Sequence, residues 1–133
     1  MKSYRIEIKP NKTQLRLIKQ SCDVARFAYN WMLGKKIAER ESLISLAKMW
    51  DLEKVPSIHG NANDWTKEWC LFKKHKEWIT TVSKCCGHFA LRDLEFAFKR
   101  FFSKKSKHPK FKKKGSKDSF SVDGWIFIDY NTI

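Results

Sequence analysis

The sequence predicts a mainly helical protein with a small β part, which is an α+β fold. The fold would hold an N-terminal strand, a helical block of roughly three or four helices and a C-terminal β-hairpin. Three observations predict it: residues 4–9 alternate apolar and charged side chains, apolar residues recur at helical spacing across residues 12–102, and Asp123-Gly124 separates two short alternating runs. The 133 residues, 42% of them hydrophobic, fit one domain with its own core.

The first predicted helix follows directly on the first strand. The strand ends at Pro10, and Asn11 or Thr13 can cap the helix that comes next. Residues 12–39 then form one long helix or a kinked pair, in which Gly34 is a mild interruption. The apolar positions that predict it are Leu15, Ile18, Cys22, Ala25, Ala28 or Tyr29, and Met32.

The middle of the chain is less regular. Residues 42–56 favour a short helix, residues 56–63 have the composition of a loop, and residues 64–79 are predicted to be helical. This last stretch holds aromatic residues among lysines, namely Trp65, Trp69, Phe72 and Trp78. Such residues could stack on bases, but tryptophan at helical spacing more often belongs to a core.

The helix over residues 81–102 is the clearest predicted element. At 100° per residue, one stripe is apolar and consists of Val82, Cys86, Ala90, Leu94, Ala97, Phe98 and Phe101. The opposite side is a mostly cationic ridge made of Lys84, His88, Arg92, Glu95 and Lys99. The ridge could lie along a duplex groove or be an ordinary solvated helix face.

A β-hairpin is predicted after this helix. Residues 119–122 and 125–129 are short alternating runs that flank Asp123-Gly124, and Asp-Gly is a strong signal for a two-residue hairpin turn. The first strand could join this hairpin in one small sheet.

Residues 99–117 form a basic run with ten Lys or Arg residues and no Asp or Glu. The run supplies +10 of the net charge of +14, and Phe101, Phe102 and Phe111 are set among its charges. Cations interleaved with aromatic rings suit nucleic acid, although a solubility tail or a localisation-like patch would share the composition. The predicted nucleic-acid-binding residues of the ridge and the run are Lys84, His88, Arg92, Lys99, Arg100, Lys104, Lys105, Lys107, Lys110, Phe111, Lys112, Lys113, Lys114 and Lys117.

The sequence offers no catalytic or metal-binding motif. The carboxylates are explained as solvated surface or turn residues, the four cysteines form no C-x-x-C pair, and the four histidines lack ligand spacing. We therefore expect no catalytic residues, no metal and no cofactor. No stretch has the length of a signal peptide's apolar region or of a membrane span, which predicts a cytoplasmic protein without a membrane partner.

Four motifs in a fixed order resemble a known family. They are residues 4–10 (YRIEIKP), residues 25–31 (ARFAYNW), residues 90–102 (ALRDLEFAFKRFF), and residues 108–120 with HPKFKKK and DSF. This order closely resembles the N-terminal region of the transposon-encoded TnpB (OrfB) family, which are RNA-guided DNA nucleases related to type V CRISPR effectors. The resemblance spans nearly the whole chain.

The resemblance implies a division of the chain. Residues 1–10 would be a strand of a small wedge barrel, residues 11–104 a helical, helix-turn-helix-like recognition region, and residues 105–133 a basic connector with the returning wedge hairpin. The barrel would be incomplete, because the chain resembles a family member truncated before the RuvC-like nuclease and the Cys-rich zinc element. The resemblance therefore implies that this chain is not an enzyme.

The resemblance also implies partners. Guide RNA and the target-adjacent DNA duplex would bind here, together with a full-length nuclease or the missing C-terminal part. The family's duplex-reading positions map onto Lys84 and His88. The family often has Gln where this chain has His88, and a His cannot make the bidentate adenine contact of Gln. The alternatives are an autonomous DNA- or RNA-binding regulator, an inactive remnant, and a nuclease that uses unusual carboxylates.

Overall fold

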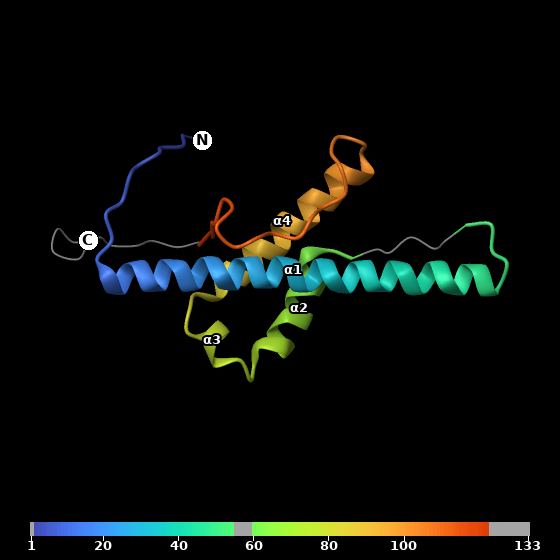
Figure 1. Ribbon diagram of the computed structural model, residues 1–133, viewed down its shortest axis with the longest axis horizontal. Helices are drawn as coiled ribbons and strands as arrows, with labels where there is room; N and C mark the ends of the chain where they lie inside the picture. The colour runs from blue at the N-terminus through green and yellow to red at the C-terminus, as the bar shows by residue number, and fades with distance from the viewer. Residues whose placement is uncertain (1, 55–59, 123–133) are drawn as a thin grey trace.

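Four helices build the described part of the chain, and the other three pack around the longest one (Figure 1). The computed structural model describes residues 2–54 and 60–122. Its helices are α1 (Lys12–Met49), α2 (Ala62–Lys73), α3 (Glu77–Thr80) and α4 (Lys84–Phe102). In Figure 1, α4 crosses the middle of α1 on one side, and α2 and α3 lie on the other side.

The first helix is continuous over 38 residues. Asn11 caps it, because its side chain accepts a hydrogen bond from the Gln14 backbone at 2.9 Å and the Gln14 side chain accepts one from the Asn11 backbone at 3.0 Å. The helix ends where Asp51 adopts a φ of 53° and the Leu52 N–H donates to the Ala47 carbonyl at 2.9 Å. The predicted helix over 12–39 therefore continues without a break into the predicted helix over 42–56, but only as far as Met49, since residues 50–54 are not helical and residues 55–56 lie outside the described residues.

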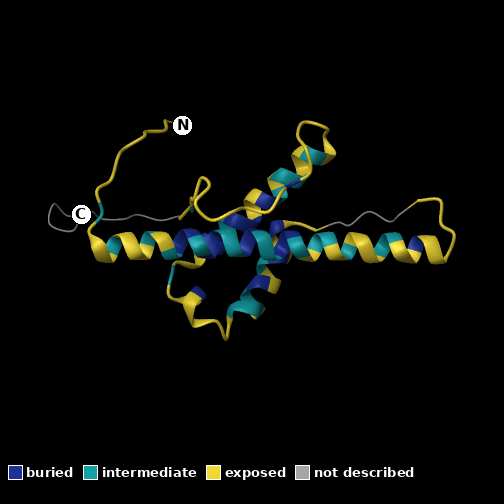
Figure 2. Cartoon of the chain, viewed as in Figure 1, coloured by how far each residue is buried: buried dark blue, intermediate teal, exposed yellow. Residues whose placement is uncertain are grey.

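Small residues form the crossing of α1 and α4. Ala25 and Ala28 of α1 and Cys86 and Ala90 of α4 are buried in one cluster, so the two backbones approach closely. Figure 2 shows that burial is concentrated at this crossing, while both ends of α1 are largely exposed.

Trp69 of α2 fills the space below the crossing. Its side chain is 1% exposed and lies against Gly87, where an added Cβ would come within 2.3 Å of the indole nitrogen. Around Trp69 lie Phe27, Trp31 and Phe72, with ring centroids 6.1, 5.5 and 5.9 Å away. The predicted tryptophan-rich stretch is thus core, at least at Trp65 and Trp69, which are both buried.

The short helix α3 closes the α1–α2 side of the core. Its Ile79 is buried, and Trp78 places its ring edge against Phe27 with centroids 5.1 Å apart. Gln20 of α1 donates to the Trp78 carbonyl at 3.1 Å and to the Thr81 hydroxyl at 2.5 Å. These bonds tie the α3 region to the first half of α1.

The β part of the predicted fold class is wrong for the residues that the structure describes, because none of them forms a strand. Residues 2–10 are not paired with another strand, and Tyr4, Ile6 and Ile8 are 80, 79 and 62% exposed. A strand needs a neighbour that pairs its backbone groups, and alternation alone does not supply one. Residues 119–122 also lack strand structure, and residues 123–133 with the rest of the predicted hairpin lie outside the described residues.

The fold is therefore helical in the part of the chain that the structure describes. No helix in residues 2–54 or 60–122 is long and apolar enough to span a bilayer.

Two glycines should respond oppositely to alanine. We expect Gly87→Ala to lower the free energy of unfolding by about 2 kcal/mol, because its methyl group would overlap the buried indole of Trp69. Gly34→Ala should raise it by about 1 kcal/mol, because the nearest atom, on the Phe111 ring, lies at an ordinary 3.8 Å. Urea denaturation of both variants measures the free energy of unfolding, and equal changes in the two variants would contradict the close Trp69–Gly87 contact.

Candidate nucleic-acid interface

The chain leaves α4 through a tight turn that sets the path of the charges that follow. Lys104 has a φ of 59°, and the Lys105 N–H donates to the Arg100 carbonyl at 2.9 Å, which is a Schellman-type helix end. We call residues 105–117, which follow this turn, the basic segment. In Figure 1 the segment (orange to red) turns back from the end of α4 and runs along α1.

The first anchor of the basic segment lies on α4. The His108 ring packs edge-on against Phe98 and Phe101, with centroids 5.7 and 5.1 Å away. Next to it Pro109 is buried, and His108 Nδ1 donates to the Pro109 carbonyl at 2.8 Å. The segment is thus packed against the end of α4 before its densest lysine cluster begins.

The second anchor is Asn30 on α1. Its side-chain amide donates to the Lys112 carbonyl at 2.9 Å and accepts from the Lys112 N–H at 2.8 Å, so it pairs with the backbone as a neighbouring strand would. The Lys112 ammonium also lies 4.3 Å from the centre of the Tyr29 ring. The Phe111 ring lies over Gly34 and remains 54% exposed.

The third anchor joins Arg26 of α1 to Asp118, just beyond the basic segment. The guanidinium lies 3.3 Å from Asp118 and 2.5 Å from Asp23. The Asp118 carboxylate also accepts from the Gly115 N–H at 3.1 Å, and Gly115 has a φ of 81° that favours glycine. This carboxylate therefore holds a turn of the backbone in place.

The anchored backbone leaves its cations in solvent. The residues that it displays, all exposed, are Lys105, Lys107, Lys110, Phe111, Lys112, Lys113, Lys114 and Lys117. Arg100 and Lys104 are exposed at the end of α4. The structure thus brings the predicted residues of the run together on one fixed stretch of chain.

The ridge residues lie on α4, and one of them, His88, contacts α2. Lys84, Arg92 and Lys99 are exposed, and Lys99 lies 3.3 Å from Glu95. His88 is half-buried, with Nε2 3.8 Å from Cys70 Sγ. Burial, and then the positive charges of Lys73 and Lys84, hold the pKa of His88 below its usual value, so the ring is neutral at pH 7.

Sequence reasoning missed Arg26, Asn30 and Asp118 as parts of this site. The signal was present, since Arg26 and Asn30 are polar residues inside the 25–31 motif that carries the family resemblance. Their partners lie 92 and 82 residues further along the chain, which no local pattern reveals.

The described residues contain no group of three His, Cys, Asp or Glu side chains that could hold a metal ion. Cys22 and Cys86 are buried free thiols, and burial raises the pKa of both. At neutral pH these thiols are protonated and therefore weakly reactive.

Comparisons with known proteins give one family match and one relative. Residues 1–42 match the helix-turn-helix domain of the OrfB family of the IS605 type. The chain is also 23% identical over 129 residues to InsQ of Escherichia coli (strain K12), which carries the name of an RNA-guided DNA endonuclease. The match covers 97% of this chain and 29% of InsQ.

These matches confirm the resemblance to the N-terminal region of the OrfB (TnpB) family. They support a nucleic-acid-binding module of helix-turn-helix type. The chain spans 29% of the length of InsQ, and the helix-turn-helix match lies within residues 1–42 of this chain.

Asn30 offers a test of the second anchor. In Asn30→Ala we expect the Lys112 amide to lose its protection from hydrogen exchange, because its acceptor is removed. Asn30→Asp keeps an acceptor and should preserve that protection. Stability should change by about 1 kcal/mol or less, because these bonds are exposed. Equal exchange in both variants would show that Asn30 does not hold the segment.

His88 should make stability depend on pH. Its pKa is lower in the folded chain than in the unfolded one, so the unfolded state binds more protons as the pH falls below about 6.5. The contribution is fully present above that pH and is lost as the pH falls toward the folded-state pKa. Urea unfolding at pH 7.5 and 5.5 should show a smaller loss in His88→Gln than in the wild type, and an equal loss would contradict this assignment.

Proposed function

We propose that this chain, similar to the N-terminal region of the OrfB (TnpB) family, binds guide RNA through its basic segment and target-adjacent duplex DNA through the ridge of α4. In such systems base pairing by the RNA selects the target sequence, and the protein holds backbone and shape. The chain would therefore recognise nucleic-acid geometry more than base order.

The observation that carries the proposal is the three-point anchoring of the basic segment. A loose lysine-rich tail would lose its conformational freedom on binding, and this loss would weaken the complex. Here His108, Asn30 and Asp118 fix the backbone before any ligand arrives. A preorganised cationic segment of this kind favours phosphate groups held at a defined spacing, as in a folded RNA.

The ridge supports a separate contact to duplex DNA. Lys84 and Arg92 lie two turns apart on the exposed side of α4, with His88 between them. The neutral His88 ring can donate or accept a single hydrogen bond, which suits one base edge or one phosphate. The two surfaces border different helices, since the ridge adjoins α2 and the basic segment follows α1.

An autonomous DNA- or RNA-binding regulator is the second candidate. The described helices enclose a core of their own, which Trp69, Met32 and Leu94 fill without the help of any strand. A core of this kind favours a chain that folds and binds by itself. Duplex binding without RNA that is as tight as RNA binding would favour this candidate over the guide-RNA role.

Removing the lysine cluster tests the proposed function. Lys110, Lys112, Lys113 and Lys114 changed together to Ala should weaken structured-RNA binding more than about 10-fold, or about 1.4 kcal/mol. The matched control changes Lys48, Lys54, Lys67 and Lys74, which are exposed on α2 or near the end of α1, to Ala. Fluorescence anisotropy measures the RNA affinity of both variants. An equal loss of affinity in the control would show that the basic segment contributes only through the net charge of the chain.

Salt dependence gives a second test. If the wild-type chain neutralises roughly six to eight phosphates, the logarithm of its affinity should fall with the logarithm of salt concentration at a slope of about −5 to −7. Titrations between 50 and 200 mM salt, roughly the usual range for such measurements, would reveal the slope. Weak binding with equal affinity for all nucleic acids would argue against the guide-RNA role.

A further inference from the structure

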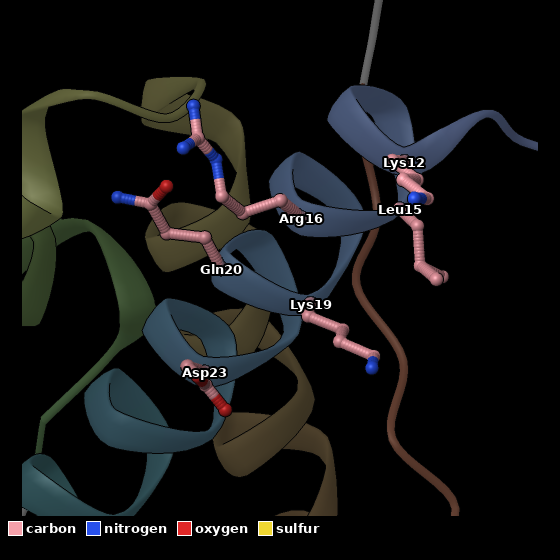
Figure 3. Close-up of a pocket in the computed structure, with 6 residues that line it drawn as sticks. All are labelled: Lys12, Leu15, Arg16, Lys19, Gln20 and Asp23. Atoms are coloured by element: carbon pink, nitrogen blue, oxygen red, sulfur yellow. The ribbon is translucent and has the colours of Figure 1, made fainter.

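The first turns of α1 carry cations that neither the basic segment nor the ridge includes. Lys12, Arg16 and Lys19 are all exposed, and they line a hollow of about 490 Å³ together with Leu15, Gln20 and Asp23 (Figure 3). In Figure 3, Arg16 and Gln20 point to one side of the helix and Lys12 and Lys19 to the other. The one carboxylate among these six, Asp23, is already paired with Arg26.

This hollow continues the path of the basic segment. Positions 12, 19 and 26 are seven residues apart, so Lys12, Lys19 and Arg26 lie along one side of the helix. Arg26 is the third anchor, and a second, smaller hollow beside it is lined by Lys113 and Lys117 of the segment. Lys12 and Lys19 therefore lie on the same side of α1 as Arg26, which is paired with Asp23 and Asp118 and borders the basic segment.

We propose that Lys12, Arg16 and Lys19, the α1 track, extend the basic segment into one continuous site for the phosphate backbone of a nucleic-acid strand. The inference rests on the proposed function and adds the course and length of the bound strand. From Lys12 to Gly34, where Phe111 lies, the helix rises about 33 Å at 1.5 Å per residue. A stacked strand at about 3.4 Å per nucleotide would cover this length with about ten nucleotides.

The part of the basic segment that lies along α1 would hold far fewer nucleotides. It extends between Arg26 and Gly34, a rise of about 12 Å or about four nucleotides, and the rest of the segment packs on α4 through His108. The two lengths are different enough to be measured with a series of oligonucleotides.

The pattern of side chains favours nucleic acid over a membrane surface. A helix that lies in a bilayer interface needs a continuous apolar face. The exposed leucines of this region, Leu15 and Leu17, are two positions apart and so point to different sides of α1. Lys12 and Lys19 on one side of α1 and Arg16 on the other, with little apolar surface between them, match phosphate groups better than a bilayer.

The test compares two variants with equal charge. The track variant changes Lys12, Arg16 and Lys19 to Ala, and the control changes Lys48, Lys54 and Lys74, all exposed, to Ala. Both reduce the net charge from +14 by three. Binding to single-stranded RNA, single-stranded DNA and duplex DNA of about 4 to 16 nucleotides is measured by anisotropy at several salt concentrations.

For the strand class that binds most tightly, the wild-type affinity should rise with length up to about ten nucleotides. In the track variant the rise should stop about six nucleotides earlier, because Arg26 lies 14 residues beyond Lys12, a span of about 21 Å. The salt slope should shrink by about 2 to 3, since each lost phosphate contact removes roughly 0.7 to 0.9. The control should keep the wild-type length dependence. A track variant identical to the control would overturn the inference.

The outcomes separate this inference from the proposed function. If the wild type binds and the lysine-cluster variant does not, while the track variant binds as the control does, only the α1 track is refuted. If the wild type binds no oligonucleotide, the proposed function fails with it. Vesicles rich in phosphatidylserine are the last comparison. If they bind the wild type as tightly as RNA does, and if the track substitutions weaken vesicle binding as much as RNA binding, the nucleic-acid assignment is overturned.

Discussion

The contact between Trp69 and Gly87 is the constraint on which the rest of the structure depends. The indole is almost fully buried, and α4 can lie over it only because Gly87 has no side chain. The same indole meets Phe27 and Trp31 of α1, so one residue of α2 sets the position of both long helices. The crossing that it fixes determines where α4 ends, and the basic segment begins from that end.

Position matters more than amount of charge in this molecule. Lysines on a free tail attract any polyanion, whereas here His108, Asn30 and Arg26 hold the chain at three places along its course. The anchors use different interactions, namely aromatic packing, backbone hydrogen bonds and an ion pair. Salt weakens the ion pair but has less effect on the other two, so the path of the segment does not rest on electrostatics alone.

Helix signals are local, so helices were predicted in the right regions, although the stretch over 64–79 is divided into α2 and α3 by residues 74–76. The Asn11 cap and the helix over 81–102, observed at Lys84–Phe102, follow from residues close to one another in the chain. The strand over 4–9 was wrong because its pattern says nothing about a pairing partner. The charged residues of the candidate site were predicted from their density, but the anchors were not, because Asn30 and Arg26 look like ordinary polar positions on a helix surface.

The unbroken course of α1 has a consequence for how this chain can change. One continuous helix carries the core face, the anchors and the cations of its first turns, so their angular phase is fixed by residue count. A single inserted residue between Lys19 and Cys22 would rotate everything before it by about 100° relative to the core, whereas seven residues would nearly restore the phase. Insertions or deletions within this part of α1 would therefore have to come in steps of about two turns to keep the anchors and the core on their present sides of the helix.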